Sequence, residues 1–207
     1  MAVTVLVTGF GPLPGARFNP TGPLVERLTR LRRPRLANTK IVSHIFPTSY
    51  AAVDRELPKL IAKHKPNALL MFGLAPRTRA LRIETRARNT VSLLPDATSA
   101  SLRRLTIAAG GPAALTMPAP ARRLLAAVRA AGVPAALSRD AGRYLCNYLC
   151  WRAAEAAGKK GGPHLAAFVH VPKVARTARR RGKRRKTTLD DLTRAGATLL
   201  AAAACHV

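Results

Sequence analysis

The chain begins with Val3-Thr4-Val5-Leu6-Val7-Thr8, and Gly9-Phe10-Gly11-Pro12 follows directly. The first six of these residues are all apolar or β-branched. An uninterrupted run of this kind, bounded by glycine and proline, is typical of a strand that is buried on both faces of a parallel sheet. We therefore predict a parallel strand over residues 3–8 that ends in a loop at Gly9.

Beyond this first strand, strand-like and helix-like segments alternate along the chain. The strand candidates are Lys40–Phe46, Ala68–Gly73, Ala135–Ser138, Leu165–Val171 and, more weakly, Leu105–Ile107. The helix candidates are Pro23–Leu31, Tyr50–Lys63, Ala119–Ala131, Tyr144–Ala157 and Thr188–Ala204. Alternation predicts an α/β fold, because parallel neighbouring strands are joined by helices that cover the faces of the sheet. We expect a three-layer α/β/α sandwich with a mostly parallel central sheet.

The length of 207 residues fits a single domain over residues 1–207, with a mobile basic loop at 173–187. No basic leader precedes the first strand, and the longest apolar run, Ala195–Ala204, is too short to span a bilayer. We expect a cytoplasmic protein without a membrane partner. Its three cysteines do not suggest a disulfide framework, and none has the spacing of a structural zinc site, so we expect no metal.

The charge of the chain is extreme: 36 Lys and Arg against 9 Asp and Glu give a formal net charge of +27. Residues 173–186 contain nine of these basic residues, so most of the basicity is spread over the rest of the chain. Such a charge favours non-specific, salt-sensitive binding to polyanions. A nucleic-acid-binding protein is therefore one alternative. Aromatic residues that could stack on bases make up only 4% of the chain, and no nucleic-acid-binding motif is found.

Three short segments each offer one member of a cysteine-nucleophile triad: Glu84, Cys146 and His170. A cysteine attacks as its thiolate, a neighbouring base takes its proton, and a third group orients that base. Cys146 stands at a predicted helix start, where the helix dipole lowers the pKa of a thiol. Gly9, Gly73 and His170 stand at predicted strand ends, so we expect them to meet Cys146 at one edge of the sheet.

The residues that carry these features resemble the type I pyroglutamyl peptidases, also called pyrrolidone-carboxylate peptidases. The resemblance covers nearly the whole chain. The order Glu, Cys, His matches the family, as does the gap of 24 residues from the cysteine to the histidine. The matching segments are Thr8–Pro12 followed by Asn19-Pro20, Glu84–Asn89, Ala141–Asn147 and Phe168–Pro172.

The resemblance implies an exopeptidase that removes an N-terminal pyroglutamyl residue from peptides through a thioester, without metal or cofactor. Cys146 would be the nucleophile, His170 the general base and then acid, and Glu84 the residue that orients the imidazole. The backbone amide of Cys146 would donate to the oxyanion. The lactam ring would lie in an uncharged pocket, with main-chain groups near Asn19 and Leu74 reading its amide. The substrate-binding residues implied are Phe10, Leu13, Asn19, Leu74, Tyr144 and Leu145.

Several positions depart from the family pattern. Leu13 stands where many relatives have phenylalanine, and Leu74 where glutamine is common. The acidic pair and the arginine that follow Asn89 in relatives are missing, because this chain reads Thr90-Val91-Ser92-Leu93-Leu94-Pro95-Asp96. A catalytically impaired family scaffold is therefore a second alternative. Family members are often tetramers, whereas self-repulsion at this charge opposes association, so a homo-oligomer is left open.

Overall fold

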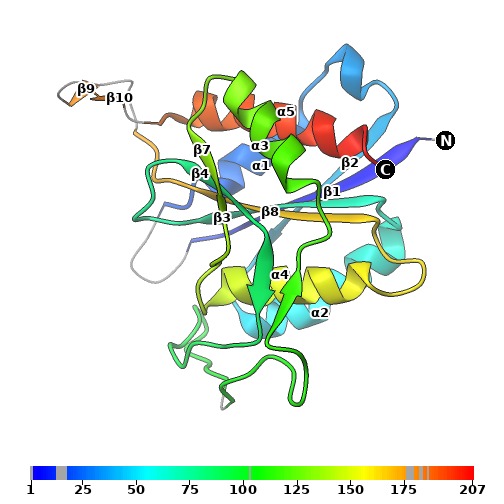
Figure 1. Cartoon of the computed structure of the whole chain (residues 1–207), viewed down its shortest axis with the longest axis vertical. Helices are drawn as coiled ribbons and strands as arrows, with labels where there is room; N and C mark the ends of the chain where they lie inside the picture. The colour runs from blue at the N-terminus through cyan, green and yellow to red at the C-terminus, as the bar shows by residue number, and fades with distance from the viewer. Residues whose placement is uncertain (1, 13–17, 103, 176–179, 182–183, 186) are drawn as a thin grey trace.

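The structure of the chain is a computed structural model, which describes residues 2–12, 18–102, 104–175, 180–181, 184–185 and 187–207. Its central sheet has the strand order β2-β1-β3-β8-β4-β7 (Figure 1). The strands are β1 (Val3–Phe10), β2 (Thr39–Phe46), β3 (Ala68–Leu74), β4 (Leu81–Glu84), β7 (Ala135–Ser138) and β8 (Leu165–Val171). β1, β2, β3 and β8 are mutually parallel, whereas β4 and β7 run in the opposite direction. The sheet is therefore mostly parallel, as predicted.

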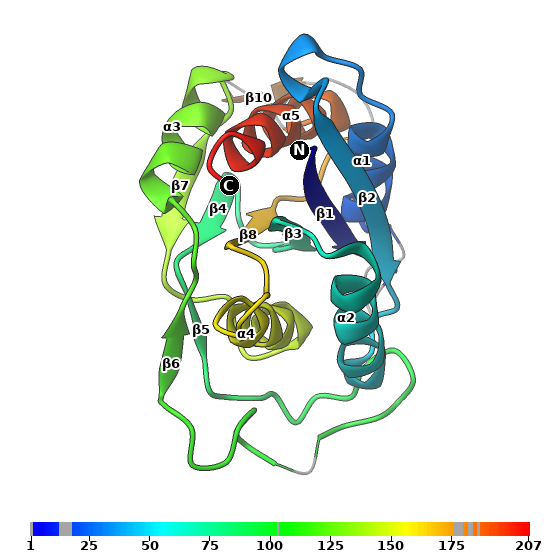
Figure 2. The same ribbon diagram turned by 90° about the vertical axis from the view of Figure 1, so that its right-hand side faces the viewer.

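Helices cover both faces of this sheet (Figure 2), which confirms the three-layer α/β/α arrangement. One layer contains α1 (Thr21–Thr29), α3 (Ala121–Ala130) and α5 (Leu189–Ala204). The other layer contains α2 (Tyr50–His64) and α4 (Leu145–Ala157), which contact each other. A short 3-10 helix, η1 (Pro34–Leu36), precedes β2.

Each face of the sheet has its own hydrophobic core, because side chains alternate between the two faces along a strand. In β1, Val5 and Val7 pack with the helices of the first layer, whereas Leu6 and Phe10 pack with α2 and α4. Every residue of β3 and β8 is buried. Strands buried on both faces need apolar side chains at every position, which explains the uninterrupted runs in the sequence.

Five short strands among the described residues were not predicted. Three of them are β4 and the antiparallel pair β5 (Arg86–Arg88) and β6 (Ala114–Thr116), which lies beside α4 (Figure 2). The other two lie in the basic segment. The strand expected over Leu105–Ile107 is wrong. This segment is a loop, and the backbone N–H of Ile107 donates to the Asn89 side chain rather than to a neighbouring strand. The first strand also continues past Thr8, because Gly9 and Phe10 still pair with β2.

Of the basic segment expected to be mobile, the strands that the structure describes lie at one end of the molecule, away from the sheet (Figure 1). They are β9 (Arg180–Arg181) and β10 (Arg184–Arg185), which pair antiparallel. Residues 176–179, 182–183 and 186 lie outside the described residues. The mobility of residues 173–187 stays a prediction.

The apolar run near the C-terminus belongs to α5, which packs on the sheet and against α1. Gly196 permits this close approach, because a Cβ at that position would lie 2.9 Å from the Leu28 side chain. Over the part of the chain that the structure describes, no helix combines the length and the hydropathy needed to cross a membrane.

A capping box starts α5 and offers a direct test of the fold. The Thr188 hydroxyl accepts a hydrogen bond from the Asp191 N–H, and the Asp191 carboxylate accepts one from the Thr188 N–H. We expect Thr188→Ala to lower the free energy of unfolding by about 1 kcal/mol, because it leaves a helix N–H without its partner. Chemical denaturation would measure this change. The control is Thr198→Ala, whose hydroxyl donates only to a carbonyl within the same helix. An equal loss in both variants would contradict the capping role.

Candidate active site

His170 lies near the carboxyl end of β8, on the face of the sheet that α4 covers. Phe168, two residues earlier, belongs to the core on this face, and its ring meets the imidazole edge-on at a centroid distance of 5.1 Å. The residue paired with His170 on β3 is Gly73. Because Gly73 has no side chain, the sheet leaves space beside the imidazole on this face.

Glu84 ends β4, which runs antiparallel to β8. In the strand register Glu84 is opposite Phe168, so it is a diagonal neighbour of His170 on the same face. A hydrogen bond of 2.7 Å joins His170 Nδ1 to Glu84 Oε1, and the two residues are 3% and 0% exposed. The carboxylate accepts, so Nδ1 carries the proton of the bond and Nε2 is left for other partners. Glu84 is therefore not part of a solvated surface ion pair, although several arginines are its neighbours in sequence.

Cys146 is the second residue of α4. The preceding cap residue, Tyr144, has an extended backbone with φ −103° and ψ −162°, so the helix begins directly after it. A Cβ built on Gly73 would lie 2.8 Å from the Cys146 sulfur, which places the sulfur over the strand position paired with His170. Amides in the first turn of a helix lack intrahelical partners and favour a negative group. The first turn of α4 therefore suits a thiolate.

The strand that precedes Cys146 does not place it in the way the sequence suggested. β7 runs opposite to β8, so the carboxyl ends of these two strands do not point in the same direction. The sulfur reaches the end of β3 because α4 itself begins there. The meeting of Gly73, Cys146 and His170 is as expected, but its cause is the position of the helix start.

The pKa of His170 reflects this arrangement. Burial alone would lower it. The negative charge of the Cys146 sulfur, the hydrogen bond to that sulfur and the hydrogen bond to Glu84 outweigh burial and raise the pKa of His170 to about 9. A protonated imidazole between a sulfur and a carboxylate is the arrangement that activates a cysteine nucleophile.

The other two cysteines have different surroundings. Cys150 lies one turn further along α4 and is fully buried. Burial raises the pKa of the Cys150 thiol well above its usual value, and the charges of Cys146 and Glu84 raise it further. Cys205 is exposed at the end of α5. Among the described residues, no group of three or more His, Cys, Asp or Glu side chains is placed to hold a metal ion.

Asn147 is a structural residue of the site that sequence reasoning did not single out. Its side-chain oxygen accepts from the Arg88 N–H at 2.9 Å, and its amide nitrogen donates to the carbonyls of Arg88 and Thr90 at 2.8 and 3.0 Å. The buried side chain thereby ties the first turn of α4 to β5, just after Glu84. Its position directly after Cys146 in the motif was the signal that could have identified it.

The first motif forms a tightly bonded loop. The Asn19 side chain donates to the Gly11 carbonyl at 2.9 Å and accepts from the Thr21 N–H and hydroxyl. Phe10 is buried in the α4-side core. The Asn19 side chain is therefore engaged within the loop. Leu13 lies outside the described residues.

The segment that replaces the family arginine lies across the start of α4. The Tyr144 hydroxyl donates to the Pro95 carbonyl at 2.8 Å. Asp96 anchors the segment to α2, because its carboxylate accepts from the Tyr50 N–H at 3.0 Å. Leu93 and Leu94 are 61% and 67% exposed. This side of the site therefore presents leucine side chains where relatives are expected to present a cation.

Leu74 and Leu145 are both buried beside the residues discussed above. Leu74 follows Gly73 at the end of β3 and pairs with Val171. Leu145 is the first residue of α4 and belongs to the core on that face. Both predicted substrate-binding positions therefore directly adjoin the Gly73–Cys146 contact.

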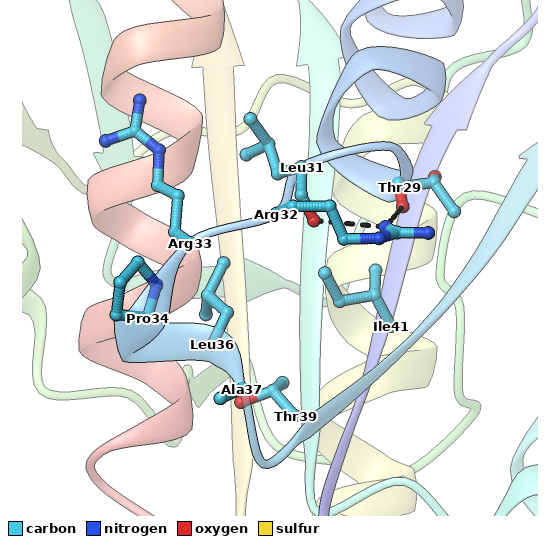
Figure 3. Close-up of a pocket in the computed structure, with 9 residues that line it drawn as sticks. All are labelled: Thr29, Leu31, Arg32, Arg33, Pro34, Leu36, Ala37, Thr39 and Ile41. Carbon is cyan, nitrogen blue, oxygen red and sulfur yellow. Dashed lines mark hydrogen bonds between the residues drawn. The ribbon is translucent and has the colours of Figure 1, made fainter.

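A cavity of about 720 Å³ lies elsewhere, between the end of α1, η1 and β2 (Figure 3). Leu31, Leu36 and Ile41 contribute apolar side chains, and Arg32 donates to the Thr29 and Leu31 carbonyls. None of its lining residues belongs to the four motifs. The cavity is therefore separate from the site formed by Glu84, Cys146 and His170.

Comparisons with known proteins indicate one family. The family model for pyroglutamyl peptidase matches residues 3–195. The chain is 30% identical over 171 residues to the pyrrolidone-carboxylate peptidase of Pyrococcus furiosus, covering 82% of this chain and 81% of that protein. It is 32% identical over 200 residues to the pyrrolidone-carboxylate peptidase of Halalkalibacterium halodurans, covering 94% and 96%.

Solved structures give the same result. The crystal structure of pyroglutamyl peptidase I from Bacillus amyloliquefaciens superposes with a TM-score of 0.87 and 29% sequence identity, covering 100% of this chain and 97% of that one. The matched region includes every motif on which the resemblance rests, and the family model alone spans most of the chain. The chain therefore belongs to the pyroglutamyl peptidase family.

Proposed function

We propose that this chain is a cysteine exopeptidase that hydrolyses the amide bond after an N-terminal pyroglutamyl residue. The proposal is carried by the buried Glu84–His170 hydrogen bond, with the Cys146 sulfur over Gly73 beside the same imidazole. Family membership supports the class of reaction. Neither the nucleic-acid-binding alternative nor the impaired scaffold has a comparable structural observation behind it.

In the first half of the reaction, the Cys146 thiolate attacks the carbonyl carbon that links pyroglutamate to the next residue. The carbonyl oxygen becomes an oxyanion, and we assign its hydrogen-bond donors to amides in the first turn of α4, including that of Cys146. The His170 imidazolium then gives its proton to the leaving amine. The carbon–nitrogen bond breaks, the shortened peptide departs, and a thioester joins pyroglutamate to Cys146.

The second half hydrolyses this thioester. His170, now neutral, takes a proton from a water molecule, and the resulting hydroxide attacks the thioester carbon. The carbon–sulfur bond breaks, pyroglutamate leaves, and the thiolate–imidazolium pair is restored. Glu84 holds Nδ1 throughout, which fixes the tautomer and stabilises the charged imidazole.

The pocket that we propose for the lactam ring combines Phe10, Leu74, Tyr144 and Leu145 with main-chain groups near Asn19. Leu13 belongs to the same proposal from the sequence alone. The side chains of Phe10, Leu74, Tyr144 and Leu145 come from the ends of β1 and β3 and from the start of α4. An uncharged ring suits such surroundings, because its burial avoids the cost of desolvating a charge.

Three further properties belong to the proposal. The net charge of +27 supports weak, salt-sensitive binding to polyanions alongside the peptidase activity. Free cysteines support a reducing, cytoplasmic location. Self-repulsion at this charge predicts that any homo-oligomer strengthens with added salt.

Hydrolysis of a pyroglutamyl coumarin amide in the presence of reductant tests the function. We expect turnover of this substrate and at least about a hundredfold lower kcat/KM for the matching prolyl amide, which has a charged ring nitrogen and no lactam carbonyl. The glutaminyl amide is a second control, because it is the open-chain form that closes to the lactam with loss of ammonia. Absence of turnover by protein that is folded by circular dichroism would favour the impaired scaffold.

A further inference from the structure

A second cation lies against the carboxylate that orients His170. Arg82 Nε is 3.6 Å from Glu84 Oε1, the same oxygen that is 2.7 Å from His170 Nδ1. Glu84 Oε2 and Arg82 Nε are both buried, and neither has a hydrogen-bond partner within the described residues. A buried carboxylate with a single hydrogen bond is unfavourable unless a nearby charge compensates it.

The position of Arg82 is fixed by the sheet. In the antiparallel register of β4 and β8, Arg82 is directly opposite His170, with Glu84 two residues further along the same face. Leu81 and Ile83, which alternate with them, belong to the core on the opposite face. Arg82 is therefore held beside the imidazole and the carboxylate by strand pairing, and not by a loop.

The titratable groups around Glu84 come from three places. β8 contributes His170, and α4 contributes Cys146 and Cys150. Burial raises the pKa of the Cys150 thiol, and the charges of Cys146 and Glu84 raise it further. Asp140, which precedes α4, interacts electrostatically with Arg82. Arg82 adds a second positively charged side chain at the same carboxylate oxygen that His170 contacts.

We propose that Arg82 is a positioning residue of this site, whose guanidinium holds the Glu84 carboxylate aligned on His170 Nδ1. The proposal rests on the function proposed above and deepens it. Glu84 in turn stabilises the imidazolium, and the imidazolium stabilises the Cys146 thiolate. Arg82 therefore lets the reactive pair persist to lower pH, without touching the substrate.

The test compares Arg82→Met, Arg82→Gln and Arg82→Lys in a Cys205→Ser background, which removes the exposed thiol. The first readout is the rate of Cys146 alkylation by iodoacetamide against pH, followed by mass spectrometry. The second is the pH profile of kcat/KM on the pyroglutamyl amide. The matched control is Arg86→Met, which removes the same charge nearby, where the guanidinium donates to the Arg139 carbonyl.

Removing a positive charge makes it easier for neighbouring groups to gain a proton. As the pH falls, the thiolate of the reactive pair is therefore protonated at a higher pH than before. We expect the acid midpoint of both profiles to rise by about one pH unit in Arg82→Met and Arg82→Gln. Arg82→Lys keeps the positive charge, so its acid midpoint should stay close to that of the unsubstituted Arg82 protein. Arg86→Met should move the midpoint by less than roughly 0.3 units, because a more distant exposed charge is screened.

Each outcome separates this proposal from the proposed function. An acid midpoint that does not move in Arg82→Met or Arg82→Gln, or that moves equally in Arg86→Met, overturns the role of Arg82 even if the protein hydrolyses the pyroglutamyl amide. A shifted alkylation profile in protein that hydrolyses no pyroglutamyl amide supports Arg82 while the proposed function fails. If Arg82→Met does not fold, Arg82→Gln and Arg82→Lys decide the result.

Discussion

Replacement of Cys146 by serine is expected to reduce kcat/KM on a pyroglutamyl amide by at least about a thousandfold. Serine keeps the size and shape of the side chain, but its hydroxyl is far harder to ionise than a thiol at the start of α4. The thiolate–imidazolium pair with His170 is then lost. Steady-state hydrolysis by both proteins at equal concentration measures the effect, and near-unchanged circular dichroism excludes unfolding as its cause.

The matched control for this experiment is Cys150→Ala. Cys150 occupies the same face of α4 one turn later, but it is fully buried, and burial keeps its thiol protonated. We expect this variant to retain most of the activity and to lose some stability through the small cavity that it creates. If Cys146→Ser keeps its activity, or if Cys150→Ala loses it to the same degree, the nucleophile has been assigned to the wrong residue.

Replacement of Gly73 by alanine is expected to lower kcat/KM about a hundredfold without removing any group of the triad. The added Cβ would lie 2.6 Å from the Phe168 ring and 2.8 Å from the Cys146 sulfur. Phe168 is fully buried, so its ring cannot move freely, and the sulfur must shift relative to His170. We also expect a loss of about 1–3 kcal/mol in stability from overpacking.

Gly22→Ala is the control for this substitution, because a Cβ at Gly22 meets nothing within 4 Å. Gly22 lies in α1, where alanine is the better helix former, so the change should be neutral or slightly stabilising. Hydrolysis rates and thermal unfolding of the two variants would be compared. Equal effects of Gly73→Ala and Gly22→Ala would show that the space over Gly73 does not hold the sulfur in place.

The charge around the triad differs from what the family resemblance implies. Relatives are expected to place an arginine after the asparagine motif, near the oxyanion, whereas this chain places exposed leucines there. The buried arginine contact in this chain is instead with Glu84, through Arg82 on β4. The two positions act on different atoms. Arg82 contacts the carboxylate that orients His170, whereas the family arginine is expected at the oxyanion.

The sequence predicted well those elements whose own residues determine them. Uninterrupted apolar runs gave β3 and β8, because a strand buried on both faces needs apolar side chains throughout. The helix predicted from Thr188 matches α5, because its start is set by local interactions, among them the capping box of Thr188 and Asp191. β4 and β5 were missed, since their arginines alternate with apolar residues over only three or four positions, too few to separate a strand from a loop.

The sequence by itself determined the fold class, the family and the three residues of the candidate triad, because each is recorded in residue types and their order. Only the tertiary structure decided how these residues meet. The antiparallel direction of β4 places Glu84 diagonally across from His170, and it places Arg82 against the same carboxylate. The missing side chain of Gly73 leaves the space that the Cys146 sulfur occupies. These contacts depend on strand register and on close approach between segments that are distant in the chain, and no local pattern of residues encodes either of them.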